Sequence, residues 1–205
     1  MMDVKRIIRD ALILFAITLI AGLALGATHE VTTPIIVGVR AEKAEKTYKE
    51  VFPTADHFGA PEEMQDKVDV CDSMIRIAQG ENVTVDQCMK AYVAKGEVIG
   101  YLVTASSKEG YGGEVTISVG IDKAAGKLTG VGFLTLNETA GLGMKAKEPE
   151  FKDQFTTKSA ATLTVIKTDG AGPMEVEAIS GATKTSRAVT NAVNAAVYFV
   201  MECLV

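Results

Sequence analysis

The most prominent feature of the hydrophobic pattern is an uninterrupted apolar run near the N-terminus. Residues 11–28 carry no charge, and a helix of this length spans about 27 Å, close to the ~30 Å hydrocarbon core of a bilayer. We therefore expect residues 1–28 to form one transmembrane helix that anchors the protein in membrane lipid. A buried helix and a cleaved signal peptide are the alternatives, the latter because Ala24, Gly26 and Ala27 are small residues of the kind that a signal peptidase accepts.

Basic residues precede the apolar run and predict its orientation. Lys5, Arg6 and Arg9 lie on its N-terminal side, which indicates a cytoplasmic N-terminus in the cytoplasmic (inner) membrane and places the following chain on the extracytoplasmic side. Residues 29–40 are expected to be a linker, in which Pro34 interrupts any continuing helix.

Residues 41–205 are predicted to form one extracytoplasmic domain that begins with helical segments. Residues 41–53 are rich in Ala, Glu and Lys and predict a short charged helix that stops near Pro53. Residues 61–80 contain helical patterns and end on a glycine, which is a common helix stop.

The second half of the chain has the pattern of an antiparallel sheet with packed helices. Each of the segments 91–107 and 115–136 contains two β-rich runs around a turn, which predicts two hairpins. A further strand is expected within 161–169, a short helix within 148–155 and a longer helix within 186–204. Consecutive strands joined by hairpins are typical of the α+β fold class.

The C-terminal helix is apolar enough to resemble a second membrane span. Asn191, Asn194 and Glu202 interrupt its apolar pattern. We therefore expect this helix to be buried against the sheet instead.

Charge, cysteine and histidine content narrow the possible chemistry. The formal net charge is −5 and no basic stripe is present, so nucleic acid is not an expected partner. Cys71 and Cys88 could pair in an oxidising compartment or stay unpaired, and neither they nor Cys203 have the spacing of a metal site. His29 and His57 have no evident catalytic partners, so we assign no catalytic and no metal-binding residue.

The candidate chemistry lies directly before the C-terminal helix. Hydroxyl residues, among them Ser180, Thr183 and Thr185, surround Gly181 and Ala182. Small residues allow a close backbone turn, and a helix N-terminus presents free N–H groups and a positive dipole end to a phosphate. On residue types alone, the more common use of such hydroxyls is to cap the helix.

The stretch Ser-Gly-Ala-Thr resembles the flavinylation motif of the FMN-binding domain family, Asp-x-x-Ser/Thr-Gly-Ala-Thr. The resemblance implies that Thr183 carries FMN through a covalent phosphoester, with Ser180, Gly181 and Ala182 beside it. Glu177 stands at the position of the Asp. Thr185 is the second candidate for the attachment point.

A second stretch, Glu-Thr-Ala-Gly-Leu-Gly, resembles the family's Glu-Thr-Pro-Gly-Leu-Gly segment, which lies against the flavin. Its two glycines let backbone amides approach a planar ring, and its leucine offers an apolar face. The Gly-Tyr-Gly-Gly-Glu-Val stretch also resembles a family segment, although a turn with a surface tyrosine fits it equally. The flavin contacts implied by these two stretches are Glu138, Thr139, Gly141, Leu142, Gly143 and Tyr111.

The family includes the G subunit of the Rnf ion-translocating ferredoxin:NAD oxidoreductase complex and the C subunit of the sodium-translocating NADH:quinone reductase. The short chain resembles the G subunit more. The resemblance implies an electron-transfer subunit of that oxidoreductase complex, not a catalyst by itself, with other membrane subunits and an FMN transferase as partners. A C-type subunit and a free-standing anchored flavoprotein are alternatives. A structural pilin-like protein is a further alternative, but it leaves both motifs unexplained.

Overall fold

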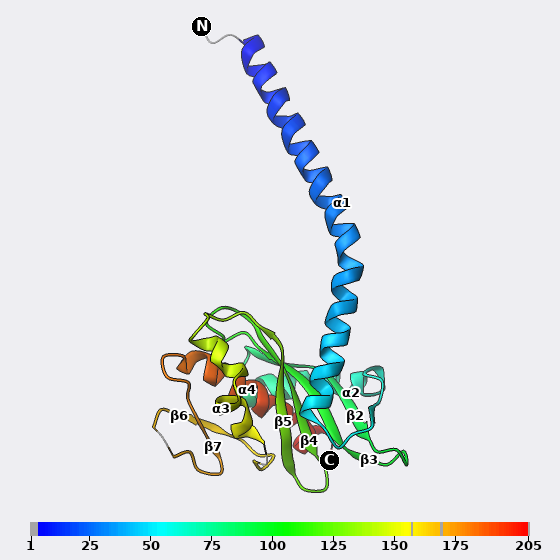
Figure 1. Ribbon diagram of the computed structural model, residues 1–205, viewed down its shortest axis with the longest axis vertical. Helices are drawn as coiled ribbons and strands as arrows, with labels where there is room; N and C mark the ends of the chain where they lie inside the picture. Colours follow the sequence, from blue (N-terminus) through cyan, green and yellow to red (C-terminus); the bar gives the residue numbers. More distant parts are fainter. Residues whose placement is uncertain (1–3, 157, 169, 205) are drawn as a thin grey trace. The chain divides into compact units, whose positions relative to one another are not determined.

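The computed structural model describes residues 4–156, 158–168 and 170–204 (Figure 1). The expected anchor and domain also include residues 1–3 and 205, and the expected strand 161–169 ends on Asp169; these positions lie outside the described residues. The chain divides into two compact units, Met1–Ala44 and Glu45–Val205.

Helix α1 runs from Val4 to Val51 and is long and apolar enough to cross a membrane by its length and composition. A signal sequence near an N-terminus has the same properties. The prediction that Pro34 interrupts the helix is wrong, because α1 continues through the expected linker 29–40. A proline removes only its own N–H donor, and the flanking residues keep theirs, so a helix can bend at a proline instead of ending there.

The second unit contains a five-stranded sheet in the order β1-β2-β3-β4-β5, in which neighbouring strands are antiparallel. A separate pair, β6 and β7, is parallel. This architecture confirms the α+β class and both predicted hairpins. The elements are β1 (His57–Phe58), α2 (Glu62–Gln79), β2 (Val83–Tyr92), β3 (Val98–Ser107), β4 (Val115–Asp122), β5 (Lys127–Leu136), the 3₁₀ helix η1 (Gly143–Lys147), α3 (Pro149–Lys152), the 3₁₀ helix η2 (Asp153–Phe155), β6 (Thr164–Ile166), β7 (Glu175–Glu177), α4 (Thr183–Tyr198) and the π-helical turn η3 (Phe199–Cys203).

Helices α2 and α4 cover one face of the sheet and form the main core with it (Figure 1). Strand β4 sends alternate residues into this core because successive side chains of a strand point to opposite faces. Helix α4 contributes apolar residues at three- and four-residue spacing. The predicted burial of the C-terminal helix is therefore confirmed. The residues involved include Val115, Ile117, Val119 and Ile121 of β4, and Val189, Ala192, Val193 and Ala196 of α4.

The last turns of α1 pack on the opposite face of the sheet, over a groove made by glycines of β4 and β5. A Cβ at Gly132 would lie 2.3 Å from Thr47 Cγ2 and 2.6 Å from Val51 Cγ2. The hydroxyl of Thr129 donates a hydrogen bond to the Val51 carbonyl at 2.7 Å. The absence of side chains at the glycines of the groove therefore lets the helix backbone approach the strands.

The three cysteines are free thiols. Burial raises the pKa of Cys88 to about 12, and burial together with a hydrogen bond to Cys71 raises the pKa of Cys203 to about 12. The structure therefore has Cys71 and Cys88 as unpaired, buried thiols, and the neighbour of Cys71 is Cys203.

The glycine groove makes a testable contribution to stability. Gly132→Ala should lower the free energy of unfolding by about 1–3 kcal/mol, because its methyl group overlaps Thr47 and Val51. Chemical denaturation of the full chain in detergent measures the change. Gly172→Ala is the control: its nearest neighbour is the flexible end of Glu175 at 3.3 Å, and its effect should stay within about 0.5 kcal/mol. Equal effects of the two substitutions would contradict the packing argument.

Candidate functional site

Helix α4 begins without a side-chain cap among the described residues. Its N-cap residue is Ala182, and the first backbone hydrogen bond of the helix runs from the Ser186 N–H to the Ala182 carbonyl at 3.0 Å. Within the part of the chain that the structure describes, the N–H groups of Thr183, Lys184 and Thr185 have no acceptor. The expectation that nearby hydroxyls cap the helix is therefore wrong, and three donors are left for another group.

The hydroxyls around the helix start differ in their accessibility. The Ser186 hydroxyl is buried and accepts the Ile179 N–H at 3.0 Å, so it holds the preceding loop instead of capping the helix. Thr185 is only 1% exposed. Thr183 is half-buried and Ser180 is exposed. An external reagent can therefore reach Thr183 and Ser180 more readily than Thr185.

The first turn of α4 is basic where the helix dipole disfavours cations. It contains no acidic residue, and Lys184 and Arg187 are both exposed. Cations near a helix N-terminus cost roughly 0.3–1 kcal/mol each at the surface. Both residues line an open cavity of about 450 Å³ together with Lys108, Asn82 and Glu109. This arrangement favours an anion at the start of the helix.

Two glycine-containing loops are fixed to each other beside the helix start. The Glu138 carboxylate accepts the Tyr111 N–H at 2.8 Å and the Gly112 N–H at 3.2 Å, so it ties the loop after β3 to the loop after β5. A Cβ at Gly143 would lie 2.7 Å from Thr185 Oγ1 and 2.7 Å from Glu138 Cβ. Only a glycine at position 143 allows the second loop to approach α4 this closely.

The two loops and the helix start enclose a cavity of about 380 Å³, within the ~300–1,000 Å³ range of small-molecule sites. The structure brings eight of the predicted site residues together there and adds Lys184, whose Nζ lies 6.0 Å from the centre of the Tyr111 ring. The lining consists of Tyr111, Glu138, Thr139, Leu142, Gly143, Gly181, Ala182, Lys184 and Thr185.

Three predicted residues do not line this cavity. Gly141 and Ser180 lie outside it, and Thr183 lies between two residues that do line it, Ala182 and Lys184. Lys184 is a cavity residue that the motifs did not predict. Its place directly after the Ser-Gly-Ala-Thr stretch was the available signal, because a basic residue in the first turn suits an anion.

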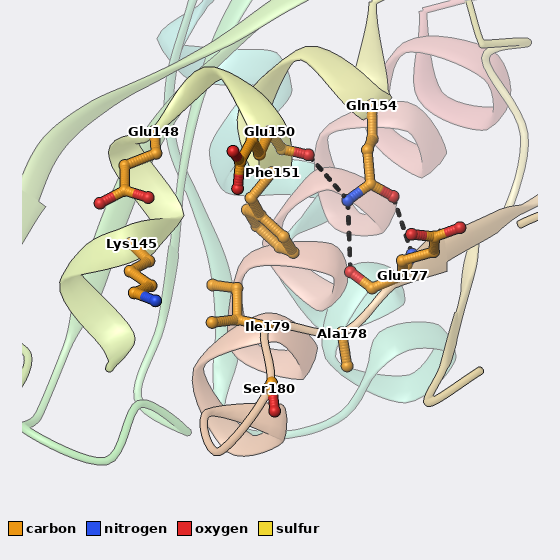
Figure 2. A pocket seen from close by; sticks show the side chains of 9 residues that line it. All are labelled: Lys145, Glu148, Glu150, Phe151, Gln154, Glu177, Ala178, Ile179 and Ser180. Atoms are coloured by element: carbon orange, nitrogen blue, oxygen red, sulfur yellow. Dashed lines mark hydrogen bonds between the residues drawn. The ribbon is translucent and has the colours of Figure 1, made fainter. Parts of the chain in front are cut away.

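Ser180 belongs to a second cavity, of about 240 Å³, which also includes Lys145, Phe151, Gln154 and Glu177 (Figure 2). At this site the amide side chain of Gln154 lies against the backbone of Glu177, as the dashed lines in Figure 2 show. The strand β7 that leads to Ser180 is therefore held by a side chain from η2.

The Glu177 carboxylate is hydrogen-bonded to the loop before β7. It accepts the N–H groups of Gly170 at 2.6 Å and Ala171 at 3.0 Å. Hydrogen bonds from Ala171 and Gly170 lower the pKa of Glu177 below its ordinary value of 4.5. The residue at the motif's acidic position thus stabilises a loop.

Comparison with known proteins identifies the relatives of this chain. Residues 110–198 match the FMN-binding domain family. The chain is 39% identical over 197 residues (94% of this chain and 90% of the relative) to the G subunit of the Na(+)-translocating ferredoxin:NAD(+) oxidoreductase complex of Acetobacterium woodii. It is 31% identical over 196 residues (92% of each chain) to the G subunit of the proton-translocating ferredoxin:NAD(+) oxidoreductase complex of Clostridium ljungdahlii. The crystal structure of Shewanella oneidensis NqrC is similar with 22% identity and a TM-score of 0.45, over 55% of this chain and 54% of that chain.

The loop contact of Glu177 predicts a pH-dependent contribution to stability. A carboxyl whose pKa is lowered by folding stabilises the folded state above its ordinary pKa, and the contribution is lost as pH falls through the lowered value. Glu177→Gln should therefore unfold more easily than the unsubstituted protein at pH 7, and the difference should shrink below about pH 4.5.

Unfolding free energies measured between pH 3 and pH 7, roughly the range over which carboxyl groups titrate, test this. Glu81→Gln, which alters an exposed carboxylate before β2, is the control and should have the smaller effect at pH 7. A constant difference between Glu177→Gln and the unsubstituted protein at every pH would rule out the linkage.

Proposed function

The chain belongs to the family of G subunits of ion-translocating oxidoreductase complexes, and from this premise we propose that it carries FMN on Thr183 and relays electrons within a ferredoxin:NAD oxidoreductase complex. At the coarser level it is an electron-transfer flavoprotein subunit. The observation that carries the finer proposal is the uncapped start of α4 beside a small-molecule cavity.

The donors at the helix start fit the phosphate of FMN. Three backbone N–H groups without acceptors among the described residues lie at the positive end of the α4 dipole. Lys184 adds a positive charge at the same place and also lines the cavity. Bound FMN supplies the redox chemistry, whereas the protein supplies attachment, orientation and electrostatics.

Accessibility favours Thr183 among the hydroxyls as the attachment point. Thr185 is only 1% exposed and lies beside Gly143, so its hydroxyl is much less accessible than that of Thr183. Ser180 is exposed but belongs to the second cavity. Thr183 is half-buried and is the first residue of α4, so it lies at the free N–H groups themselves.

Attachment requires an enzyme partner and a balanced exchange. We propose that an FMN transferase uses FAD as the donor. The Thr183 oxygen forms a bond to the flavin-side phosphorus, the phosphoanhydride bond to AMP breaks, and the hydroxyl proton leaves to a base on the transferase. AMP is the second product. The phosphoester retains the cofactor without modifying its ring system.

The cavity side chains suit a planar, largely apolar ring. Leu142 is 44% exposed and Tyr111 is 74% exposed, although both line the cavity and are large enough to cover a ring. The Glu138 carboxylate holds the Tyr111 backbone at the cavity. Leu142 and Tyr111 are therefore placed to contact the ring, and the absence of a side chain at Gly143 lets the backbone of the same loop approach it.

Helix α1 supports a membrane location for this activity. Its uncharged stretch is long enough to span a bilayer, and basic residues precede it in the sequence. We propose that α1 anchors the protein in the membrane lipid with its N-terminus in the cytoplasm and the FMN-binding domain on the extracytoplasmic side. Its electron-transfer partners are then other membrane subunits of the Rnf-type complex.

The attachment point can be tested by in-gel fluorescence. The full chain is produced together with an FMN transferase and run on a denaturing gel under ultraviolet light. The fluorescent band should disappear in Thr183→Ala, because the nucleophilic oxygen is gone, and should persist in Thr183→Ser. Thr185→Ala is the matched control and should keep the label. A label that survives Thr183→Ala, or an unsubstituted protein that carries no covalent flavin, would overturn the assignment.

A further inference from the structure

The strand that leads into the Ser-Gly-Ala-Thr loop is paired with another strand on one edge only. Strand β7 pairs with β6 in parallel, with Ile166 opposite Glu177. On the β6 side, the Ala178 N–H donates to the Ile166 carbonyl at 2.8 Å. Because backbone groups alternate sides along a strand, the N–H and C=O groups of Glu177 point to the other edge, where the described residues form no third strand.

The side chain of Gln154 occupies this other edge. Its Oε1 accepts the Glu177 N–H at 2.8 Å, and its Nε2 donates to the Glu177 carbonyl at 3.3 Å (Figure 2). The same Nε2 lies 3.3 Å from the Glu150 carbonyl, one helical turn earlier. The carboxamide thus makes the same pair of bonds that a neighbouring strand would make.

Gln154 is itself on a well-anchored segment. It lies in η2 between Phe151 and Phe155, which are buried and in edge-to-face contact at 5.6 Å between ring centres. This segment follows η1, which begins at Gly143 of the cavity. Gln154 therefore links two segments that border the 380 Å³ cavity. One is the chain that follows Gly143, and the other is the strand that precedes Gly181.

A second side-chain amide also forms a clamp, that is, one hydrogen bond to the N–H and one to the carbonyl of the same backbone residue. Asn194 of α4 accepts the Leu163 N–H at 2.8 Å and donates to the Leu163 carbonyl at 2.9 Å. That clamp is buried beneath the start of β6. The Gln154 clamp instead holds a residue three positions before Ser180, where a shift of the backbone is passed directly to the loop.

We propose that Gln154 is a positioning residue for the flavin site: through the backbone of Glu177 it sets where the Ser180–Thr183 loop lies relative to the loop of residues 138–143. This inference rests on the proposed attachment of FMN to Thr183. Gln154 acts through the strand and does not line the 380 Å³ cavity. Its loss should slow the labelling of Thr183 and alter the environment of the bound ring while the fold persists.

The test compares three variants of the full chain with the unsubstituted protein. Gln154→Met keeps the length of the side chain but removes both hydrogen bonds. Gln154→Glu keeps an acceptor for the Glu177 N–H and loses the donor to the Glu177 carbonyl. Gln65→Met is the matched control, because it also removes a glutamine hydrogen bond, to Asp69 at 2.9 Å, on the exposed face of α2.

The rate of covalent FMN incorporation by an FMN transferase is measured per folded protein, with the folded fraction taken from thermal unfolding. Gln154→Met should react about tenfold more slowly, the factor that about 1.4 kcal/mol of activation free energy represents. Gln154→Glu should also be slowed, because it loses the donor to the Glu177 carbonyl. Visible circular dichroism and the midpoint potential of the bound flavin should change in both Gln154 variants. Gln65→Met should match the unsubstituted protein in every readout.

The outcomes separate this inference from the proposed function. If the unsubstituted protein acquires no covalent FMN, the proposed function fails and the role of Gln154 fails with it. If the unsubstituted protein is labelled and both Gln154 variants stay within about twofold of its rate with unchanged flavin spectra and potentials, a difference too small for a positioning role, only the Gln154 inference is overturned. Slower labelling that merely follows a lower folded fraction also overturns it. If Gln154→Met does not fold, Gln154→Glu decides.

Discussion

Three backbone N–H groups at the start of α4 cannot be satisfied within the helix, and no other described residue accepts a hydrogen bond from them. Helix α4 is buried along most of its length against the sheet, so these donors hold fixed positions. The residue at the N-cap position is Ala182, which has no side chain that can cap the helix, and the nearby Ser186 hydroxyl accepts the Ile179 N–H instead. A rigid helix with a free N-terminus is a preorganised anion site, and it needs no rearrangement when a phosphate binds.

The sheet supports this arrangement from its other face. The last turns of α1 occupy the groove over Gly120, Gly130 and Gly132, where these strand positions have no side chains. The central strands are thus covered on both faces, by α2 and α4 on one side and by the end of α1 on the other. The cavity is lined by the loops that follow β3 and β5 and by the start of α4, and loops can vary without disturbing such a core.

The sequence predicts the parts of this structure that have a repeating pattern. Alternating β-rich runs predict both hairpins, and the three- and four-residue spacing from Val189 predicts the burial of α4. Pro34 led to the wrong prediction that the first helix is interrupted, because one missing N–H donor is not enough to end α1. Strands β1 and β7 are too short to show a period. For the site, local motifs indicate the loops, but the partners of Glu138 and Gln154 come from distant segments, and no local pattern encodes such contacts.

The two elements that flank the Ser180–Ala182 loop, β7 and α4, differ in how their positions are fixed. Helix α4 is fixed by an extensive apolar core, whereas the strand that leads into it belongs to a pair of three-residue strands, which is marginal without further support. The amides of Asn194 and Gln154 supply that support by pairing with the backbone beside each strand. Each amide forms two hydrogen bonds with the backbone of a single residue, Leu163 or Glu177, as one residue of a neighbouring strand would. The position of β7 therefore depends on a few hydrogen bonds, whereas that of α4 depends on the apolar core.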